Sequence, residues 1–415
     1  MTRTLSPLFR PLSIRSLELP NRIVMSPMTR SHSPGGVPGA DVAEYYRRRA
    51  AGGTGLIITE GTAIEHATAV DNPLVPRMYG DDALELATRG RRGPRRGRPD
   101  HPPAVARGPP LGRNDPRDVD PALTPMKPSG VWGKPGVTSY SEDYVAQATQ
   151  PCRAMTDEDI ADTITAYTQA ARNAREVGFD GIALHGGHGY LLDSFLWDST
   201  NQRDDEWGGD LERRTRYPSA VVASIRNAIG DDAPIFFRFS QHKQQDYTAQ
   251  IAQSPDELKT ILTALVDAGV DVFDASIRRF DAPVFDGSDL SLAGWAKKLT
   301  GVTSMAVGSV GIGASLRESM AAGSLPPRTT FPNSNADFPP TSSTSPPSAG
   351  STLPIPRWRP RSGRDPTFRN STGRRTQPTS SESRTRQRCR WMIGSPGWHP
   401  SQRESRSSSA PNVLP

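Results

Sequence analysis

Short apolar runs alternate with amphipathic segments of helical length along most of the chain, and this alternation restricts its fold more than any other feature. Bounded by turn-forming residues, the apolar runs predict buried parallel strands at 22–28, 55–62, 181–187, 235–240, 270–276 and 304–310. Apolar residues at helical spacing predict helices at 41–51, 156–177, 217–229, 255–268, 292–299 and 314–322. Strands that are each followed by a helix are typical of a (β/α)8 barrel or of a doubly wound sheet, and their number alone does not distinguish the two.

Two stretches interrupt this alternation. Residues 89–113 are dominated by Arg, Gly and Pro, and residues 323–415 by Pro, Ser, Thr and Arg. They help to explain why hydrophobic residues make up only 34% of the chain, below the roughly 45–50% of a typical globular protein. Segments of this composition bury too little apolar surface to fold. We therefore expect a folded domain at 1–322, interrupted by the basic segment, and a disordered tail at 323–415.

The formal net charge of +6 is concentrated in these arginine-rich stretches. Such segments can contact nucleic-acid phosphates, but here they contain few aromatic residues to stack on bases, which disfavours a nucleic-acid partner. Cys152 and Cys389 lie far apart without metal-ligand spacing, which favours a reducing compartment. No apolar run approaches the roughly 20 residues of a membrane span, and no secretory signal is visible. We expect a cytoplasmic protein without a membrane partner, and the sequence does not indicate its oligomeric state.

The chemically most informative residues stand where the predicted strand at 181–187 ends. His185 and His188 are three residues apart and Tyr190 follows, at the rim where the active sites of barrels gather. Two imidazoles can hydrogen-bond one carbonyl or anionic oxygen, and a nearby phenol can supply a proton. The alternatives are a metal site or two polar histidines at the rim. No third metal ligand stands out, so we predict no metal.

The same segment, continued by Asn201 and by Trp207 to Gly209, resembles the Old Yellow Enzyme family of flavin-dependent ene-reductases. The family pattern is a His-x-x-His or His-x-x-Asn pair, then Gly-Tyr-Leu, then Asn-x-Arg-x-Asp-x-Tyr-Gly-Gly. Further similar segments, in the family's order, lie at 8–30, 58–62, 237–247 and 307–311. The resemblance covers residues 5–87, about 115–140 and 156–322. It implies a flavin-binding (β/α)8 TIM barrel.

The resemblance also implies roles for individual residues. His185 and His188 would bind the activating group of the substrate, and Tyr190 would donate the proton. The residues that would bind FMN are Pro27, Met28, Thr29, Gly61, Arg238, Gly308 and Ser309. Thr29 would touch the flavin near N5 and O4, Arg238 would lie at the pyrimidine end, and the amides of Gly308 and Ser309 would bind the phosphate.

The implied reaction has two halves. NADH or NADPH reduces FMN, and the flavin then passes hydride to the β-carbon of a small activated alkene while Tyr190 protonates the α-carbon. Taken one by one, several of these residues have plainer roles. Thr29 could be a helix cap, Arg238 an ion pair of the barrel core, and Gly308 a turn at the end of a strand.

Three residues depart from the family. His242 stands where relatives often have Trp, Asp274 where they often have His, and Trp207 where Tyr is usual. These departures affect the expected shape of the substrate rather than the class of reaction.

The two interrupting stretches occupy the places of the family's third and eighth strands, neither of which is recognisable in this reading frame. Pro103 to Ala106 stands where the family has a Gln-Leu-Trp-His-like run. Frames shifted by one base after residue 89 and by two bases after residue 326 can encode both missing motifs. We therefore hypothesise two local frameshifts and expect an incomplete barrel with weak or absent FMN binding and poor solubility. The alternatives are an inactive pseudoenzyme and, less favoured, a basic nucleic-acid-binding protein.

Overall fold

The structure is a computed structural model that describes residues 6–70, 72–89, 104–107, 124–140, 142, 145–146 and 152–310. All of them belong to the first of the two units into which the chain divides, Met1–Ser342. The helix predicted at 314–322, the tail at 323–415 and most of the basic segment at 89–113 lie outside the described residues. The domain division and the nucleic-acid alternative, which depend on these stretches, therefore stay predictions.

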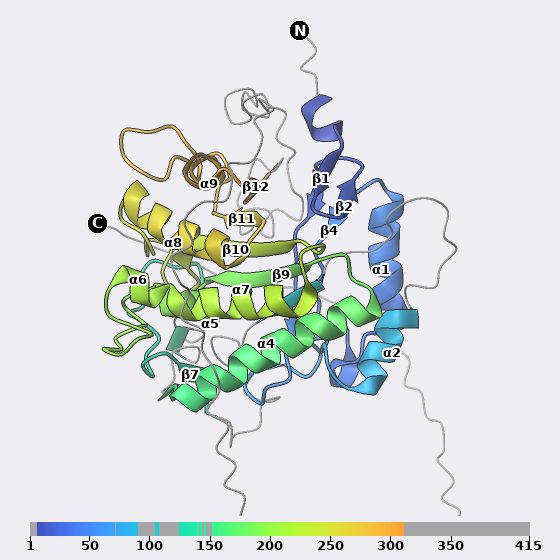
Figure 1. Cartoon of the computed structure of the whole chain (residues 1–415), viewed down its shortest axis with the longest axis horizontal. Coiled ribbons are helices and arrows are strands. Elements are labelled where there is room, and N and C mark those ends of the chain that lie inside the picture. Colours follow the sequence, from blue (N-terminus) through green and yellow to red (C-terminus); the bar gives the residue numbers. More distant parts are fainter. Residues whose placement is uncertain are drawn as a thin grey trace, which may run out of the picture. The chain divides into compact units, whose positions relative to one another are not determined.

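Six strands form one parallel sheet in the order β12-β11-β10-β9-β6-β5, of which Figure 1 labels β9 to β12. Their bounds are β5 Thr62–Ala63, β6 Ala104–Arg107, β9 Ile182–His188, β10 Ile235–Lys243, β11 Val272–Ser276 and β12 Thr303–Val307. A further parallel pair joins β3 (Val24–Met25) to β4 (Leu56–Ile57), which precedes β5 along the chain. The strands are therefore neighbours in chain order, as in a barrel, whereas a doubly wound sheet reverses its order. The described residues form an incomplete barrel, as expected.

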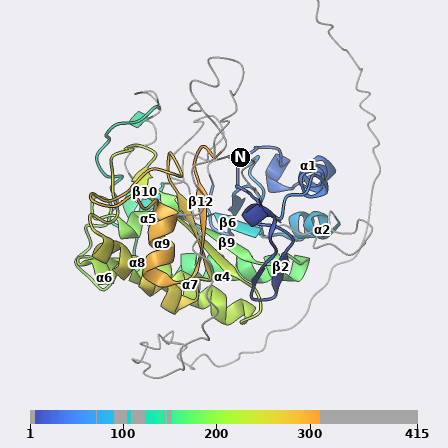
Figure 2. The same ribbon diagram turned by 90° about the horizontal axis from the view of Figure 1, so that it is seen from above.

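Helices follow the strands and cover the outside of the sheet. They are α1 Ala40–Ala51, α2 Asp81–Arg89, α4 Asp157–Val177, α5 Leu191–Leu196, α6 Leu211–Arg214, α7 Arg216–Ile229, α8 Pro255–Ala268 and α9 Leu292–Thr300, with 3-10 turns at Ser6–Phe9 and Pro34–Gly36. Figure 2 shows α4, α7 and α8 at the periphery, outside β9 and β12. None of the helices in the described ranges is long and apolar enough to cross a membrane.

Capping side chains mark the start of several helices in the second half of the chain. Thr156 accepts a hydrogen bond from the backbone N–H of Asp159, whose carboxylate accepts one from the N–H of Thr156, so α4 begins with a capping box. Ser254 and Ser291 accept equivalent bonds at the starts of α8 and α9. Because of these caps, the helices predicted there agree with the observed bounds to within about one residue.

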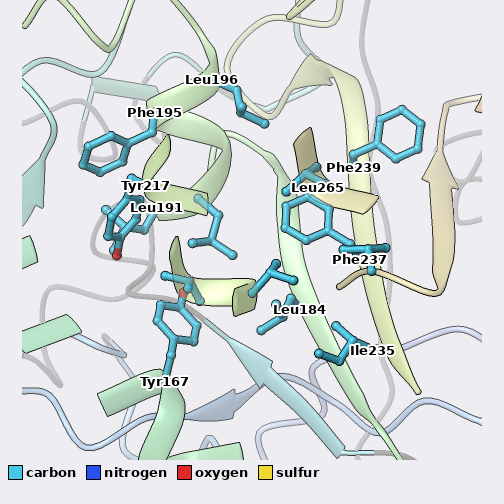
Figure 3. Close-up of a cluster of buried hydrophobic side chains, with 14 of the residues drawn as sticks. Tyr167, Leu184, Leu191, Phe195, Leu196, Tyr217, Ile235, Phe237, Phe239 and Leu265 are labelled. Carbon is cyan, nitrogen blue, oxygen red and sulfur yellow. The ribbon is translucent and has the colours of Figure 1, made fainter. Parts of the chain in front are cut away.

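The largest core lies between the sheet and the helices (Figure 3). Phe195 of α5 and Tyr217 of α7 stack with ring centroids 4.0 Å apart. The Tyr217 hydroxyl donates a hydrogen bond of 2.9 Å to Thr163 Oγ1 on α4. On the sheet, Phe237 of β10 packs against Gly186 of β9, where a Cβ would lie 2.1 Å from the phenyl ring. Only glycine fits at residue 186, so this pair sets how closely the ring of one strand approaches the backbone of the next.

A hairpin of β1 (Leu12–Ile14) and β2 (Leu17–Leu19) packs against the strands near their amino ends. It contributes to a second buried cluster, formed by Ile14, Leu17, Leu19, Leu56, Ile58, Ala183, Phe236 and Val272. Apolar side chains therefore fill the barrel from this end. The opposite end, where the strands finish, is the one at which barrels place their sites.

The strands differ from the sequence-based expectation at several places. β6 takes the place of the third strand, where none was recognisable, and pairs with β5 on one side and β9 on the other. It is held in the sheet by backbone hydrogen bonds, which local composition does not reveal. The strand predicted at 55–62 is split into β4 and β5, and the strand predicted at 304–310 ends at Val307. A short pair, β7 (Met126–Lys127) with β8 (Arg153–Ala154), was not predicted. The place of the eighth strand lies beyond residue 310, outside the described residues.

Candidate active site

A cavity of about 200 Å³ opens where the strands end. It is lined by Pro27, Thr29, Ile58, Gly61, Ala183, Leu184, His185, His188, Tyr190, Phe236, Arg238, Gln244 and Asp274. The walls combine apolar side chains with a few hydrogen-bonding and charged groups, which is the usual make-up of a small-molecule site.

Three charged or polar side chains stand in one row across neighbouring strands of this cavity. Arg238 of β10 is in register with His185 of β9 on one side and with Asp274 of β11 on the other. The Arg238 Nε and Nη2 atoms lie 2.7 and 2.6 Å from Asp274 Oδ2, and the two side chains are only 11% and 4% exposed. Burial raises the pKa of the Asp274 carboxyl, and the Arg238 guanidinium opposes that rise. The cavity therefore contains a cation whose charge is balanced by a neighbouring carboxylate.

The two histidines and the tyrosine lie together at the end of β9. The rings of His185 and Tyr190 have centroids 4.4 Å apart, and those of His185 and His188 5.1 Å. His188 Nε2 hydrogen-bonds to Ser276 Oγ over 2.8 Å. Gln244 Nε2 donates to the Tyr190 hydroxyl over 3.2 Å. These bonds orient one histidine and the phenol towards the same cavity.

His242 extends this group towards the rim. Its ring centroid lies 5.0 Å from that of His188 and 6.0 Å from that of Tyr247. Burial lowers the pKa of His242 to about 4, and the charges of Lys243 and Arg278 lower it in the same direction. His242 is therefore neutral near pH 7 and adds no charge to the site.

The opposite wall comes from the loops after β3 and β4, and one buried carboxylate holds them together. Glu60 accepts a hydrogen bond of 2.9 Å from the backbone N–H of Arg30 and one of 3.3 Å from the Tyr46 hydroxyl. The backbone N–H of Glu60 donates in return to the Tyr46 hydroxyl over 2.8 Å. Burial raises the pKa of Tyr46. Because Thr29 precedes Arg30 and Gly61 follows Glu60, these bonds set the position of both cavity-lining residues.

The structure brings most of the sequence-predicted site residues together. Those that line the cavity are Pro27, Thr29, Gly61, His185, His188, Tyr190 and Arg238. Met28 is 56% exposed and is not among the lining residues. Gly308 and Ser309 are also not among the lining residues. The Gly308 carbonyl accepts from the N–H of Phe280, and the Ser309 hydroxyl donates to the carbonyl of Arg278. In the described ranges no group of three or more His, Cys, Asp or Glu side chains could hold a metal ion.

Sequence reasoning missed Gln244 as a residue of this site. It follows the last residue of β10, and a polar residue directly after a barrel strand is the signal that could have identified it. Asp274 was noticed only as a departure from the family, because its ion pair with Arg238 depends on the register of two strands.

Comparison with known proteins gives one family. The profile of the NADH:flavin oxidoreductase / NADH oxidase family matches residues 7–87 and 111–322, more than half of the chain. The match leaves out residues 88–110 and the segment after 322, close to the two stretches that interrupt the sequence pattern.

Among curated proteins, 12-oxophytodienoate reductase 7 of Oryza sativa subsp. japonica is 35% identical over 240 residues, 55% of this chain and 57% of that protein. A chanoclavine-I aldehyde reductase of Penicillium roqueforti is 38% identical over 230 residues, 54% of this chain and 56% of that protein. The chain thus spans about half the length of the curated relatives it matches.

Two solved structures share the fold. The Old Yellow Enzyme homologue from Zymomonas mobilis has a TM-score of 0.59 and 25% identity, over 76% of this chain and 86% of that chain. Morphinone reductase in complex with tetrahydroNAD has a TM-score of 0.57 and 23% identity, over 72% of this chain and 79% of that chain. At this identity the second likeness concerns the fold alone.

Proposed function

Because this chain belongs to the NADH:flavin oxidoreductase / NADH oxidase family, we propose that it is an FMN-dependent NAD(P)H oxidoreductase that reduces small activated alkenes. The observation that carries the proposal is the meeting of His185, His188 and Tyr190 at one cavity beside Arg238. Paired imidazoles and a phenol are the groups needed to bind a carbonyl oxygen and to protonate the carbon next to it.

The cavity fits the ring system of a flavin. Ile58, Leu184 and Phe236 provide apolar walls, and Thr29 and Arg238 provide polar groups at the edges, as a flat ring with polar edges requires. Its volume of about 200 Å³ is below the range of roughly 300–1,000 Å³ for whole drug-sized ligands. We therefore propose that the cavity takes only the ring system, and that the phosphate of the same FMN lies at Gly308 and Ser309, outside the lining. When bound, FMN would supply the hydride chemistry, which no side chain can perform.

The residues of this chain would bind and protonate the substrate. His185 and His188 would hydrogen-bond the carbonyl oxygen and stabilise the negative charge that develops there. The bond to Ser276 keeps the ring of His188 in place for this role. Tyr190 would give its proton to the α-carbon of the alkene. Its bond from Gln244 uses the phenol oxygen as the acceptor and does not consume that proton.

The test separates the two halves of the reaction. Full-length protein is incubated with FMN and NADH or NADPH, and flavin reduction is followed by its absorbance with and without 2-cyclohexenone. For Tyr190→Phe we expect cyclohexenone reduction to slow by about 10²–10⁴, the usual contribution of a general acid. Flavin reduction without the alkene keeps its rate, because that step needs no proton from Tyr190.

Tyr79→Phe is the matched control, because Tyr79 packs against the main core and is not among the residues that line the cavity. It should leave both rates unchanged. Equal cyclohexenone rates for wild type and Tyr190→Phe would contradict the role of Tyr190. A protein that takes up no FMN would contradict the proposed function and favour the pseudoenzyme.

A further inference from the structure

Three fully or almost fully buried charged side chains lie behind the turn that carries His188 and Tyr190. Lys243 Nζ is 2.9 Å from Asp193 Oδ1 and 2.7 Å from Asp193 Oδ2, and both side chains are 0% exposed. Lys127 is also buried, and its ammonium lies 4.6 Å from the centroid of the Trp132 ring. None of these three side chains is among those that line the cavity.

Two of these charges bind the backbone of a single residue, Gly189. The Asp193 carboxylate accepts the hydrogen bond of the Gly189 N–H, and Lys127 Nζ donates to the Gly189 carbonyl over 2.8 Å. Lys243 neutralises Asp193 from its other side. The N–H of Gly189 is thus bound by Asp193, four residues further along the chain, and its carbonyl by the distant Lys127. We call Lys127, Asp193 and Lys243 the Gly189 anchor.

The turn needs such support because its backbone is unusual. His188 has φ of 61° and Gly189 of 83°, so two consecutive residues are left-handed. This conformation is unfavourable for histidine, which carries a Cβ, and persists only where the surroundings determine it. The change of direction at these residues points His188 and Tyr190 into the same cavity.

The charges of the anchor are poorly explained by stability alone. Burial raises the pKa of Asp193 and lowers the pKa of both lysines, to about 7 for Lys127. These directions show that the charged forms are costly to bury. A buried ion pair can often be replaced by apolar side chains of similar volume without loss of stability. A buried pair of this cost fits a role in fixing one local geometry.

We propose that Lys127, Asp193 and Lys243 are positioning residues that hold the left-handed turn at His188 and Gly189, and so set the direction of Tyr190. Only the kinetic consequence of this proposal rests on the proposed function. The geometric consequence can be measured without cofactor or substrate.

The test is amide hydrogen exchange of the full chain in the double variant Asp193→Leu, Lys243→Met, which replaces the pair by apolar side chains. The amides to read are those of His188 and Tyr190, because they donate to Ser240 Oγ and to the Gly187 carbonyl and not to the anchor. We expect the urea midpoint to be retained and exchange at both amides to become at least about tenfold faster. Lys127→Met, which removes only the bond to the Gly189 carbonyl, should act in the same direction.

The matched control removes the pair formed by Arg226 and Asp271, which lies near the amino ends of β10 and β11. Arg226→Met with Asp271→Leu should leave exchange at His188 and Tyr190 unchanged. Wild-type exchange in the folded anchor variants would overturn the proposal. Loss of the unfolding transition in the double variant would also overturn it, because the charges would then support the whole fold. If the enzyme reduces cyclohexenone, the anchor variants should lower kcat and leave kcat/KM for NAD(P)H unchanged, because that ratio reports only the flavin-reducing half of the reaction.

Discussion

Residues 6–89 and residues 152–310 build opposite walls of the same cavity by different means. In the first region β3, β4 and β5 are two residues long each, and the N-cap of α1 is Gly39, which has no side chain to cap the helix. In the second region β9 and β10 have seven and nine residues, and most helices begin with a side-chain cap.

The difference shows what positions each wall. The register of β9, β10 and β11 sets the positions of His185, Arg238 and Asp274. Many backbone hydrogen bonds between these strands therefore hold the three residues in place. Thr29 and Gly61 are next in the chain to Arg30 and Glu60, which side-chain bonds of Glu60 and Tyr46 hold in place. The proposed substrate-binding groups are therefore positioned by long, extensively hydrogen-bonded strands. The loops proposed to contact the flavin are held in position by a few side-chain hydrogen bonds.

The largest expected effect compares the cores of the two regions. Phe237→Ala should lower the free energy of unfolding by about 3–5 kcal/mol, because the ring is fully buried and its loss leaves a cavity against Gly186. Met25→Ala, at a half-buried position of β3, should cost only about 1 kcal/mol. Urea denaturation measures the loss of unfolding free energy in both variants. Equal losses would show that the cores of the two regions contribute equally to stability.

The second effect depends on pH and compares two histidines. The pKa of His242 in the folded protein is about 4, below the value of about 6.5 in an unfolded chain. The unfolded chain therefore binds more protons between these values, so this contribution to stability is present above about pH 6.5 and is lost as the pH falls towards 4. His242→Gln should remove up to about 3 kcal/mol of this pH dependence.

His66, in the first region, is the matched comparison for His242. Its pKa is also lowered, chiefly by burial, with Asp159 and Asp162 opposing the shift. His66→Gln should therefore change the pH dependence of stability in the same direction. If His242→Gln leaves the difference in unfolding free energy between pH 4 and pH 7 unaltered, burial does not lower the pKa of His242 in the folded protein.

The smallest effects concern the helix starts. Thr156→Ala should cost about 1 kcal/mol, because it removes the cap of α4. Gly39→Ser should stabilise α1 by a few tenths of a kcal/mol, roughly the difference between serine and glycine caps. The new Cβ would lie 2.6 Å from Asp41 Oδ1, the mobile end of an exposed side chain that can turn away. Shifts of the urea midpoint measure both changes, and a destabilising Gly39→Ser would show that the start of α1 is already optimal.

The sequence predicts best what neighbouring residues determine. The helix at 255–268 was predicted with its observed bounds because Ser254, Pro255 and Gly269 mark its ends within the chain itself. The grouping of His185, His188 and Tyr190 needs only the end of one strand. The split of the strand at 55–62 could not be predicted, since it arises where Glu60 bonds to Tyr46 and Arg30 from another part of the chain.

Contacts across the fold were equally hidden in the sequence. Lys127 and Gly189 are separated by 62 positions, and Arg238 and Asp274 by 36. Nothing near Arg238 in the chain indicates that its charge is balanced, so both the flavin contact and the core ion pair remained open for it. The ion pair is observed, and the flavin contact remains part of the proposed function.

The row formed by His185, Arg238 and Asp274 has a consequence for how this site can change over evolutionary time. A substitution at one of these positions changes the charge or the hydrogen bonding available to the residues in register with it on the adjacent strands. Exchanging the carboxylate at 274 for an imidazole would leave Arg238 without its counter-charge. The uncompensated guanidinium would then act on His185, its neighbour on the other side. A single substitution in the row therefore changes the electrostatic environment of the other two side chains, which limits the single changes that the site tolerates.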